Sequence, residues 1–134
     1  MTITTFDDLL AAARAQPEPQ RLLLVFAGAG PGSEPTPAQQ SAFEQGHGGE
    51  LTPLMCVDKG LDELADFAAL VEQSRLAGPP WAIVFAAALS GTAGAPPDSR
   101  TAEVPLQRMV DNIRSGVLAN MIAFDTAGQA VTLD

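Results

Sequence analysis

The chain has 134 residues, the size of one domain, and we expect residues 1–134 to fold as a single unit. Hydrophobic residues make up 46% of it and charged residues 17%, a balance that is typical of globular proteins and excludes a disordered chain. Sixteen acidic and seven basic residues give a net charge of −9, so no basic stripe is available to bind nucleic acid or an anionic membrane.

The number of cysteines and the length of the apolar runs indicate the cellular compartment. Cys56 is the single cysteine, which excludes an internal disulfide and every two-cysteine metal spacing. Residues 1–8 lack the basic start and apolar run of a signal peptide. The longest apolar run, residues 81–89, is too short to cross a bilayer. We therefore expect a cytoplasmic protein, with no cofactor, no metal site and no membrane contact.

The first elements are a helix and a strand. Thr5 followed by Asp8 forms a capping box, and the helix that it opens is expected to end before Pro17. Residues 21–29 are predicted to form a strand whose continuous apolar run indicates cover on both faces. A loop is expected from residue 28 onward, followed by a short helix over residues 38–45.

The later elements follow from apolar runs separated by glycine and proline. Thr101 is predicted to cap a helix that holds Pro105 in its first turn. A hairpin is predicted around a turn at residues 125–128. The remaining predicted elements are a strand over residues 51–57, a helix over 61–77 that ends at Gly78-Pro79-Pro80, and a strand over 81–89.

The order of these elements predicts the fold class. Apolar strands that alternate with helices favour an α/β fold, a layered mixed sheet with parallel pairs and an antiparallel C-terminal hairpin. The alternative is a two-layer α+β sandwich, which applies if residues 38–45 form a loop instead of a helix.

A glycine-rich run invites comparison with nucleotide-binding loops. Gly28-Ala29-Gly30-Pro31-Gly32 follows a strand, as a dinucleotide-binding fingerprint does. Ser33 stands where the fingerprint requires its third glycine, Pro31 removes an amide donor, and Glu34 adds a charge that repels phosphate. We therefore interpret the run as a turn-forming loop.

No residue is assigned a catalytic role. His47 is the only histidine, and alone it provides neither a triad nor a metal site, so a surface loop position is favoured. Cys56 lies in an apolar segment, where a cysteine is expected to behave as a small buried hydrophobe.

One group of residues is a candidate ligand site. If the strands are parallel, Asp58 and Lys59 end the second strand, and the loops over residues 28–34 and 90–100 leave the same edge of the sheet. Ligands of open α/β sheets bind at that edge. The hypothesis is that a small-molecule or peptide site is bordered by Asp58, Lys59, Ser90 and Arg100. The competing interpretation is that Asp58 caps a helix and the loops are solvated.

Four segments resemble a family of short proteobacterial proteins of unknown function, whose members often carry the label "ribonucleotide reductase subunit alpha". The resemblance covers essentially the whole chain. Because a catalytic reductase subunit needs a radical cysteine and a redox pair, which Cys56 alone does not supply, it implies no reductase site residues here. The segments are Thr5-Phe-Asp-Asp-Leu-Leu, Gln16-Pro-Glu-Pro-Gln-Arg-Leu-Leu, Thr52-Pro-Leu-Met-Cys-Val-Asp-Lys59 and Gly78-Pro-Pro-Trp-Ala-Ile-Val-Phe85.

The function that these observations favour is a non-enzymatic binding or protein-interaction module. We expect a homodimer, in which the exposed C-terminal hairpin pairs with its copy, or a contact with another protein. The alternative is a small-molecule-binding protein or an enzyme with its site near Asp58, Lys59 and Arg100.

Overall fold

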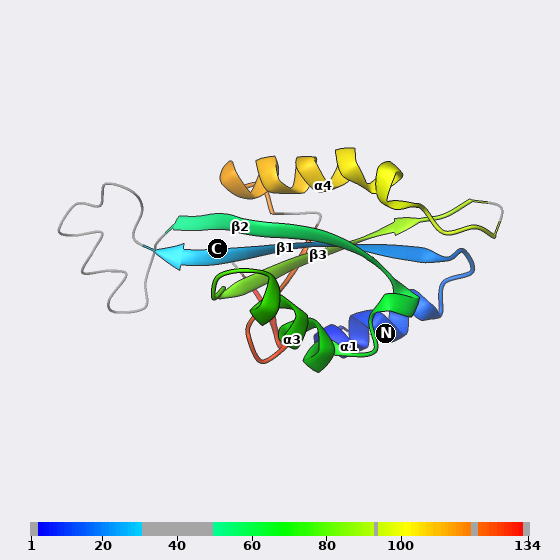
Figure 1. The fold of residues 1–134 in the computed structure, drawn as a ribbon, viewed down its shortest axis with the longest axis horizontal. Coiled ribbons are helices and arrows are strands. Elements are labelled where there is room, and N and C mark those ends of the chain that lie inside the picture. Colours follow the sequence, from blue (N-terminus) through cyan, green and yellow to red (C-terminus); the bar gives the residue numbers. More distant parts are fainter. Residues whose placement is uncertain (1–2, 31–49, 93, 119–120, 133–134) are drawn as a thin grey trace.

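A computed structural model describes residues 3–30, 50–92, 94–118 and 121–132 (Figure 1). The helices are α1 (Phe6–Arg14), the short 3₁₀ helix η1 (Leu61–Glu63), α3 (Phe67–Ala77) and α4 (Ser99–Arg114). The strands are β1 (Gln20–Gly30), β2 (Glu50–Gly60), β3 (Ile83–Ser90), β4 (Ile122–Phe124) and β5 (Ala130–Val131). The helix predicted over residues 38–45 lies outside the described residues.

The strands form one sheet in the order β2-β1-β3-β4-β5, and every neighbouring pair is antiparallel. The predicted α/β fold with parallel pairs is therefore wrong, and the fold is α+β. Strands β2 and β3, which α3 connects in the sequence, run in the same direction. They are not neighbours, however, because β1 lies between them and pairs antiparallel with both.

Helices cover both faces of this sheet. Figure 1 shows α4 above the strands and α1 with α3 below them. The α+β alternative therefore has the right class, but the molecule has three layers instead of two. Two hydrophobic cores result, one between the sheet and α1 with α3, and one between the sheet and α4.

Strand β1 supplies both cores. Its side chains alternate between the faces, so that Leu22, Leu24 and Phe26 face α1 and α3 while Leu23 and Val25 face α4. All five are buried, which confirms the prediction of a strand covered on both faces. The strand also continues to Gly30, so residues 28–30 belong to it and not to the predicted loop.

Aspartate caps set two helix starts that the sequence placed elsewhere. Asp66 accepts a hydrogen bond from the Ala69 amide, so α3 begins after it and not at residue 61. Asp98 accepts from the Thr101 amide over 2.8 Å, so α4 begins three residues before the predicted start. The predicted capping box of Thr5 and the C-terminal hairpin are confirmed.

Three phenylalanines join the N-terminal helix to the far end of the sheet. The Phe6 ring lies 5.4 Å from Phe67 and 5.3 Å from Phe124, measured between ring centroids. The Phe6 amide donates to the carbonyl of Gly128 in the β4–β5 turn. Gly128 has a φ of +83°, and a β-carbon there would lie 2.9 Å from the Phe67 ring. The turn therefore needs glycine both for its backbone and for its packing.

We expect Phe6→Ala to lower the free energy of unfolding by about 3–5 kcal/mol, because it empties the centre of this cluster. Urea denaturation followed by circular dichroism measures the change. Leu76→Ala is the matched control, since Leu76 is 84% exposed, and it should change stability by less than about 0.5 kcal/mol. Equal losses in the two variants would contradict the proposed role of Phe6.

Candidate functional site

The antiparallel register brings part of the predicted site to one end of the sheet. Asp58 and Lys59 lie beside the start of β1, because β2 runs against it. Ser90 ends β3 and pairs with Gln20 at the same end. The loop over residues 28–34 was expected at this edge too, but residues 28–30 form the last part of β1 at the opposite end of the sheet, and residues 31–34 lie outside the described ranges. The parallel-sheet premise was therefore wrong for that loop.

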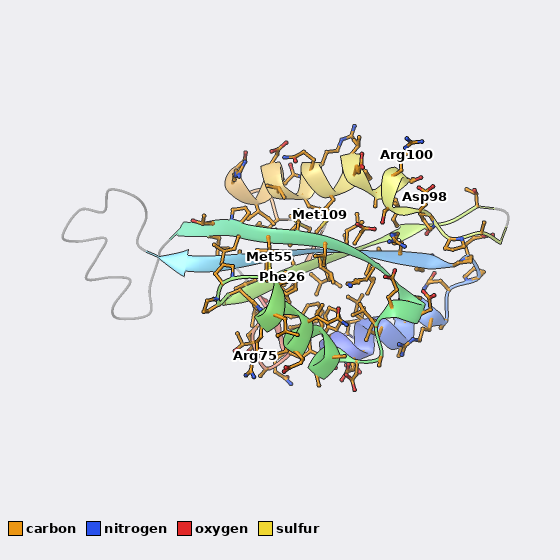
Figure 2. The ribbon with its side chains drawn as sticks, in the orientation of Figure 1. Phe26, Met55, Arg75, Asp98, Arg100 and Met109 are labelled. Carbon is orange, nitrogen blue, oxygen red and sulfur yellow. The ribbon has the colours of Figure 1, made fainter. Side chains whose placement is uncertain are left out.

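The four predicted residues divide between the two faces. Asp58 stands opposite Leu23 on the α4 side, whereas Lys59, the next residue, is on the α1 and α3 side. The Ser90 hydroxyl accepts a hydrogen bond of 3.0 Å from the side-chain amide of Gln20. Arg100 is exposed and lies at the start of α4, on its outer side (Figure 2). The four side chains share an end of the molecule but do not converge.

Asp58 instead belongs to a cluster that the sequence analysis missed. Its Oδ2 accepts a hydrogen bond of 2.6 Å from Nε of Arg21 and one of 2.5 Å from the Ser99 hydroxyl. Nη2 of Arg21 also donates to that hydroxyl over 2.8 Å. The cluster thus ties β1, β2 and the first residue of α4 together. Only the strand register reveals it, because Arg21 and Asp58 are 37 residues apart.

The cluster keeps Asp58 ionised. Partial burial by itself would raise the pKa of the carboxyl group. The hydrogen bonds from Ser99 and Arg21, together with the charge of Arg21, outweigh that effect and lower the pKa below its ordinary value. The two side chains are only 20% and 14% exposed. A carboxylate whose pKa is lowered in this way is a weak base, so the arrangement suits a structural link better than proton transfer.

The sequence analysis also considered Cys56 and His47. Cys56 is exposed on β2, so the expectation of a buried cysteine was wrong. It lies beside Val25 on the α4 side, but β2 is an edge strand of the sheet and this side chain is left open to solvent. His47 lies outside the described residues. Within the described ranges, no three histidine, cysteine, aspartate or glutamate side chains gather as a metal site would require. No helix in that part of the chain has the length and apolarity to span a membrane.

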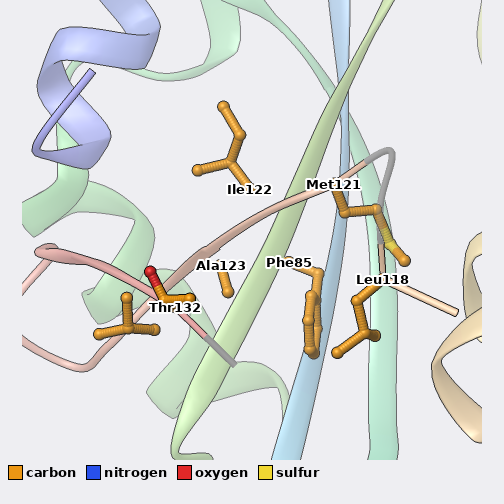
Figure 3. A pocket seen from close by; sticks show the side chains of 7 residues that line it. Phe85, Leu118, Met121, Ile122, Ala123 and Thr132 are labelled. Carbon is orange, nitrogen blue, oxygen red and sulfur yellow. The ribbon is translucent and has the colours of Figure 1, made fainter. Parts of the chain in front are cut away.

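Two depressions in the described surface lie away from the predicted residues. One, of about 260 Å³, opens on the α4 side of the sheet (Figure 3). It is lined by Phe85, Leu118, Met121, Ile122, Ala123, Val131 and Thr132. The other, of about 480 Å³, lies at the end of α3, where Arg75, Trp81 and Thr126 contribute to its wall. Neither periodicity nor motifs could have located them, since each joins segments that are distant in the sequence.

No known protein family, curated protein or solved structure matches this chain. The resemblance to short proteobacterial proteins therefore stays a prediction.

We expect Asp58→Asn to lower the free energy of unfolding by about 1–3 kcal/mol at neutral pH, because it weakens the hydrogen bonds of a largely buried arginine. The folded-state pKa of Asp58 lies below the unfolded value, so its stabilisation is complete above about pH 5 and is lost as the pH falls through the folded-state pKa. The difference between wild type and variant should therefore shrink in acid.

Urea denaturation at several pH values measures this difference. Asp111→Asn, which removes an exposed carboxylate from α4, is the matched control and should cost less than about 0.5 kcal/mol. A loss for Asp58→Asn that stays constant down to strongly acidic pH would contradict the role of the ionised carboxylate.

Proposed function

We propose that the chain is a non-enzymatic protein-interaction module that forms a homodimer through the apolar sheet face beside α4. The observation that carries the proposal is the incomplete cover of this face. Helix α4 packs over β1 and β2, and the sheet face beyond it, on β3, β4 and β5, holds the depression of Figure 3.

This uncovered face is apolar. Phe85 and Ala123 of this face are buried in the core under α4, but the apolar side chains around them are only partly buried. Val117, three residues beyond the end of α4, is 53% exposed. A continuous apolar surface beside a core is typical of a protein–protein contact. The partly buried residues of this face are Ile83, Ala87, Leu89, Leu118, Met121 and Val131.

Charge distribution favours a second copy on this side. Helix α4 carries three arginines and two acidic residues, whereas α1, η1 and α3 together carry two arginines and five acidic residues. Two chains of net charge −9 repel each other least where their faces are closest to neutral. A two-fold dimer places the same face of each copy in contact, so the α4 side meets this requirement and the α1 and α3 side does not.

The sheet edges support a dimer less well than this face. The hairpin edge, which the sequence suggested as the contact, is occupied: the Ala130 amide donates to the Thr4 carbonyl over 2.8 Å. At the other edge, Pro53 of β2 has no amide hydrogen, and the Gly60 amide donates to Glu63. Such features discourage the addition of another strand.

The alternative function, an enzyme or small-molecule binder near Asp58, Lys59 and Arg100, has less support. The Asp58 carboxylate is held by Arg21 and Ser99, and Lys59 lies on the other face of the sheet. We also propose that the module acts in the cytoplasm, where a thiol as exposed as that of Cys56 stays reduced.

We expect sedimentation equilibrium at micromolar concentration to give twice the chain mass of 13.9 kDa. Val117→Asp should shift the protein to monomer, because it places a charge on an exposed residue next to Leu118, which lines the depression of this face. Leu76→Asp, an equivalent change at an exposed position of α3, should leave the dimer intact. A monomeric wild type, or an equal effect of the two variants, would exclude this dimer and leave a different protein as the occupant to be sought.

A further inference from the structure

A second surface feature, on the opposite side of the sheet from the proposed dimer contact, has the properties of a ligand pocket. The depression at the end of α3 has a volume of about 480 Å³, which falls within the usual range of small-ligand sites. Its wall joins the last turns of α3, the connection to β3 and the turn after β4. The residues that matter for its chemistry are Val71, Arg75, Pro79, Pro80, Trp81 and Thr126.

The Trp81 wall of this pocket is held in place before any ligand arrives. The indole lies edge-on to Phe26, with 5.1 Å between ring centroids. Its Nε1 donates a 2.9 Å hydrogen bond to the hydroxyl of Ser74, which is buried and donates in turn to the Val71 carbonyl. A fixed aromatic wall loses little conformational entropy when a ligand binds.

The connection that follows α3 is also confined. A β-carbon at Gly78 would lie 2.7 Å from Sδ of Met55, so the connection packs against the end of this β2 side chain. Pro79 and Pro80 then limit the backbone further, since each has a fixed φ. The apolar part of the pocket is therefore rigid on two sides.

Arg75 gives the pocket its polarity. Among the described residues of the wall it is the only charged one, and Figure 2 shows it on the outer side of α3. Its Nη1 lies 3.9 Å from a carboxylate oxygen of Glu72, and both side chains are mostly exposed, at 74% and 68%. An ion pair that is this long and this exposed contributes little to stability. The guanidinium can therefore turn toward a ligand at little cost.

One arginine beside an apolar wall selects a particular class of ligand. The guanidinium matches a carboxylate in two parallel hydrogen bonds. A phosphate with two charges would need more cations than this one, and the net charge of −9 repels it more strongly than it repels a single charge. The ligand is therefore an anion of charge −1 with an apolar body that can lie against Trp81.

We propose that this pocket binds an apolar group that ends in a single carboxylate. A peptide with a hydrophobic C-terminal residue and a small aliphatic acid both have this chemistry. In either case the carboxylate pairs with Arg75, and the apolar part contacts Trp81 and the two prolines. The proposal is independent of the dimer, because the two surfaces lie on opposite faces of the sheet.

The chain carries its own reporter for this site. Trp81 is its only tryptophan, and it has no tyrosine, so the intrinsic fluorescence comes from the wall of the pocket. We expect a saturable change in emission on titration of the full chain with octanoate, or with a tryptophan-free pentapeptide ending in leucine. Octanamide and the C-terminally amidated peptide should bind at least about tenfold more weakly, as the loss of one charged hydrogen-bonded pair predicts.

Two variants decide whether Arg75 is responsible. Arg75→Gln should bind the acid and the amide equally, and the exposure of this residue protects the fold from the change. Arg108→Gln, on the exposed surface of α4, is the matched control and should retain the preference for the acid. If the peptide binds more tightly than octanoate, the ligand is a protein C-terminus. If octanoate binds more tightly, the ligand is a small acid. Equal binding of acid and amide by the wild type, an unchanged preference in Arg75→Gln, or no saturation would overturn the proposal.

Discussion

The burial of β1 on both faces is the constraint on which the rest of the structure depends. Its apolar side chains alternate between two cores, with Leu22, Leu24 and Phe26 in one and Leu23 and Val25 in the other. Each such side chain contributes about 1.5–3 kcal/mol when it leaves water, so neither face can stay open at the centre of the sheet. Helices therefore lie on both sides, and the molecule has three layers.

The polar groups at the start of β1 serve the same arrangement. Arg21 precedes the apolar run and holds Asp58 of β2 and Ser99 of α4, which fixes the helix over the strand that it must cover. The candidate site predicted from the sequence contains one member of this cluster. The carboxylate of Asp58 and the guanidinium of Arg21 bind each other, so these polar groups stabilise the fold. A binding surface is therefore sought at other parts of the molecule.

The cover of the two faces is unequal, and both proposals arise from that inequality. On one face, α1 and α3 with η1 enclose the aromatic cluster of Phe6, Phe67 and Phe124. On the other, α4 lies over β1 and β2, and an apolar surface remains beside it. At the end of α3, the connection to β3 leaves a rigid pocket with Arg75 at its rim. At each of these two places, apolar side chains stay partly exposed to solvent, which is what a binding surface requires.

The sequence by itself determined the features that depend on neighbouring residues. The continuous run in β1 indicated burial on both faces, the spacing of Thr5 and Asp8 indicated a helix start, and Gly78 with two prolines indicated a helix end. Only the tertiary structure decided the strand order, the ion pair of Arg21 with Asp58 and the exposure of Cys56. The reason is physical: periodicity reports how many faces of a strand are buried, but not which strand lies beside it. The position of β1 between β2 and β3 depends on pairing between distant segments, and so does every site that this pairing creates.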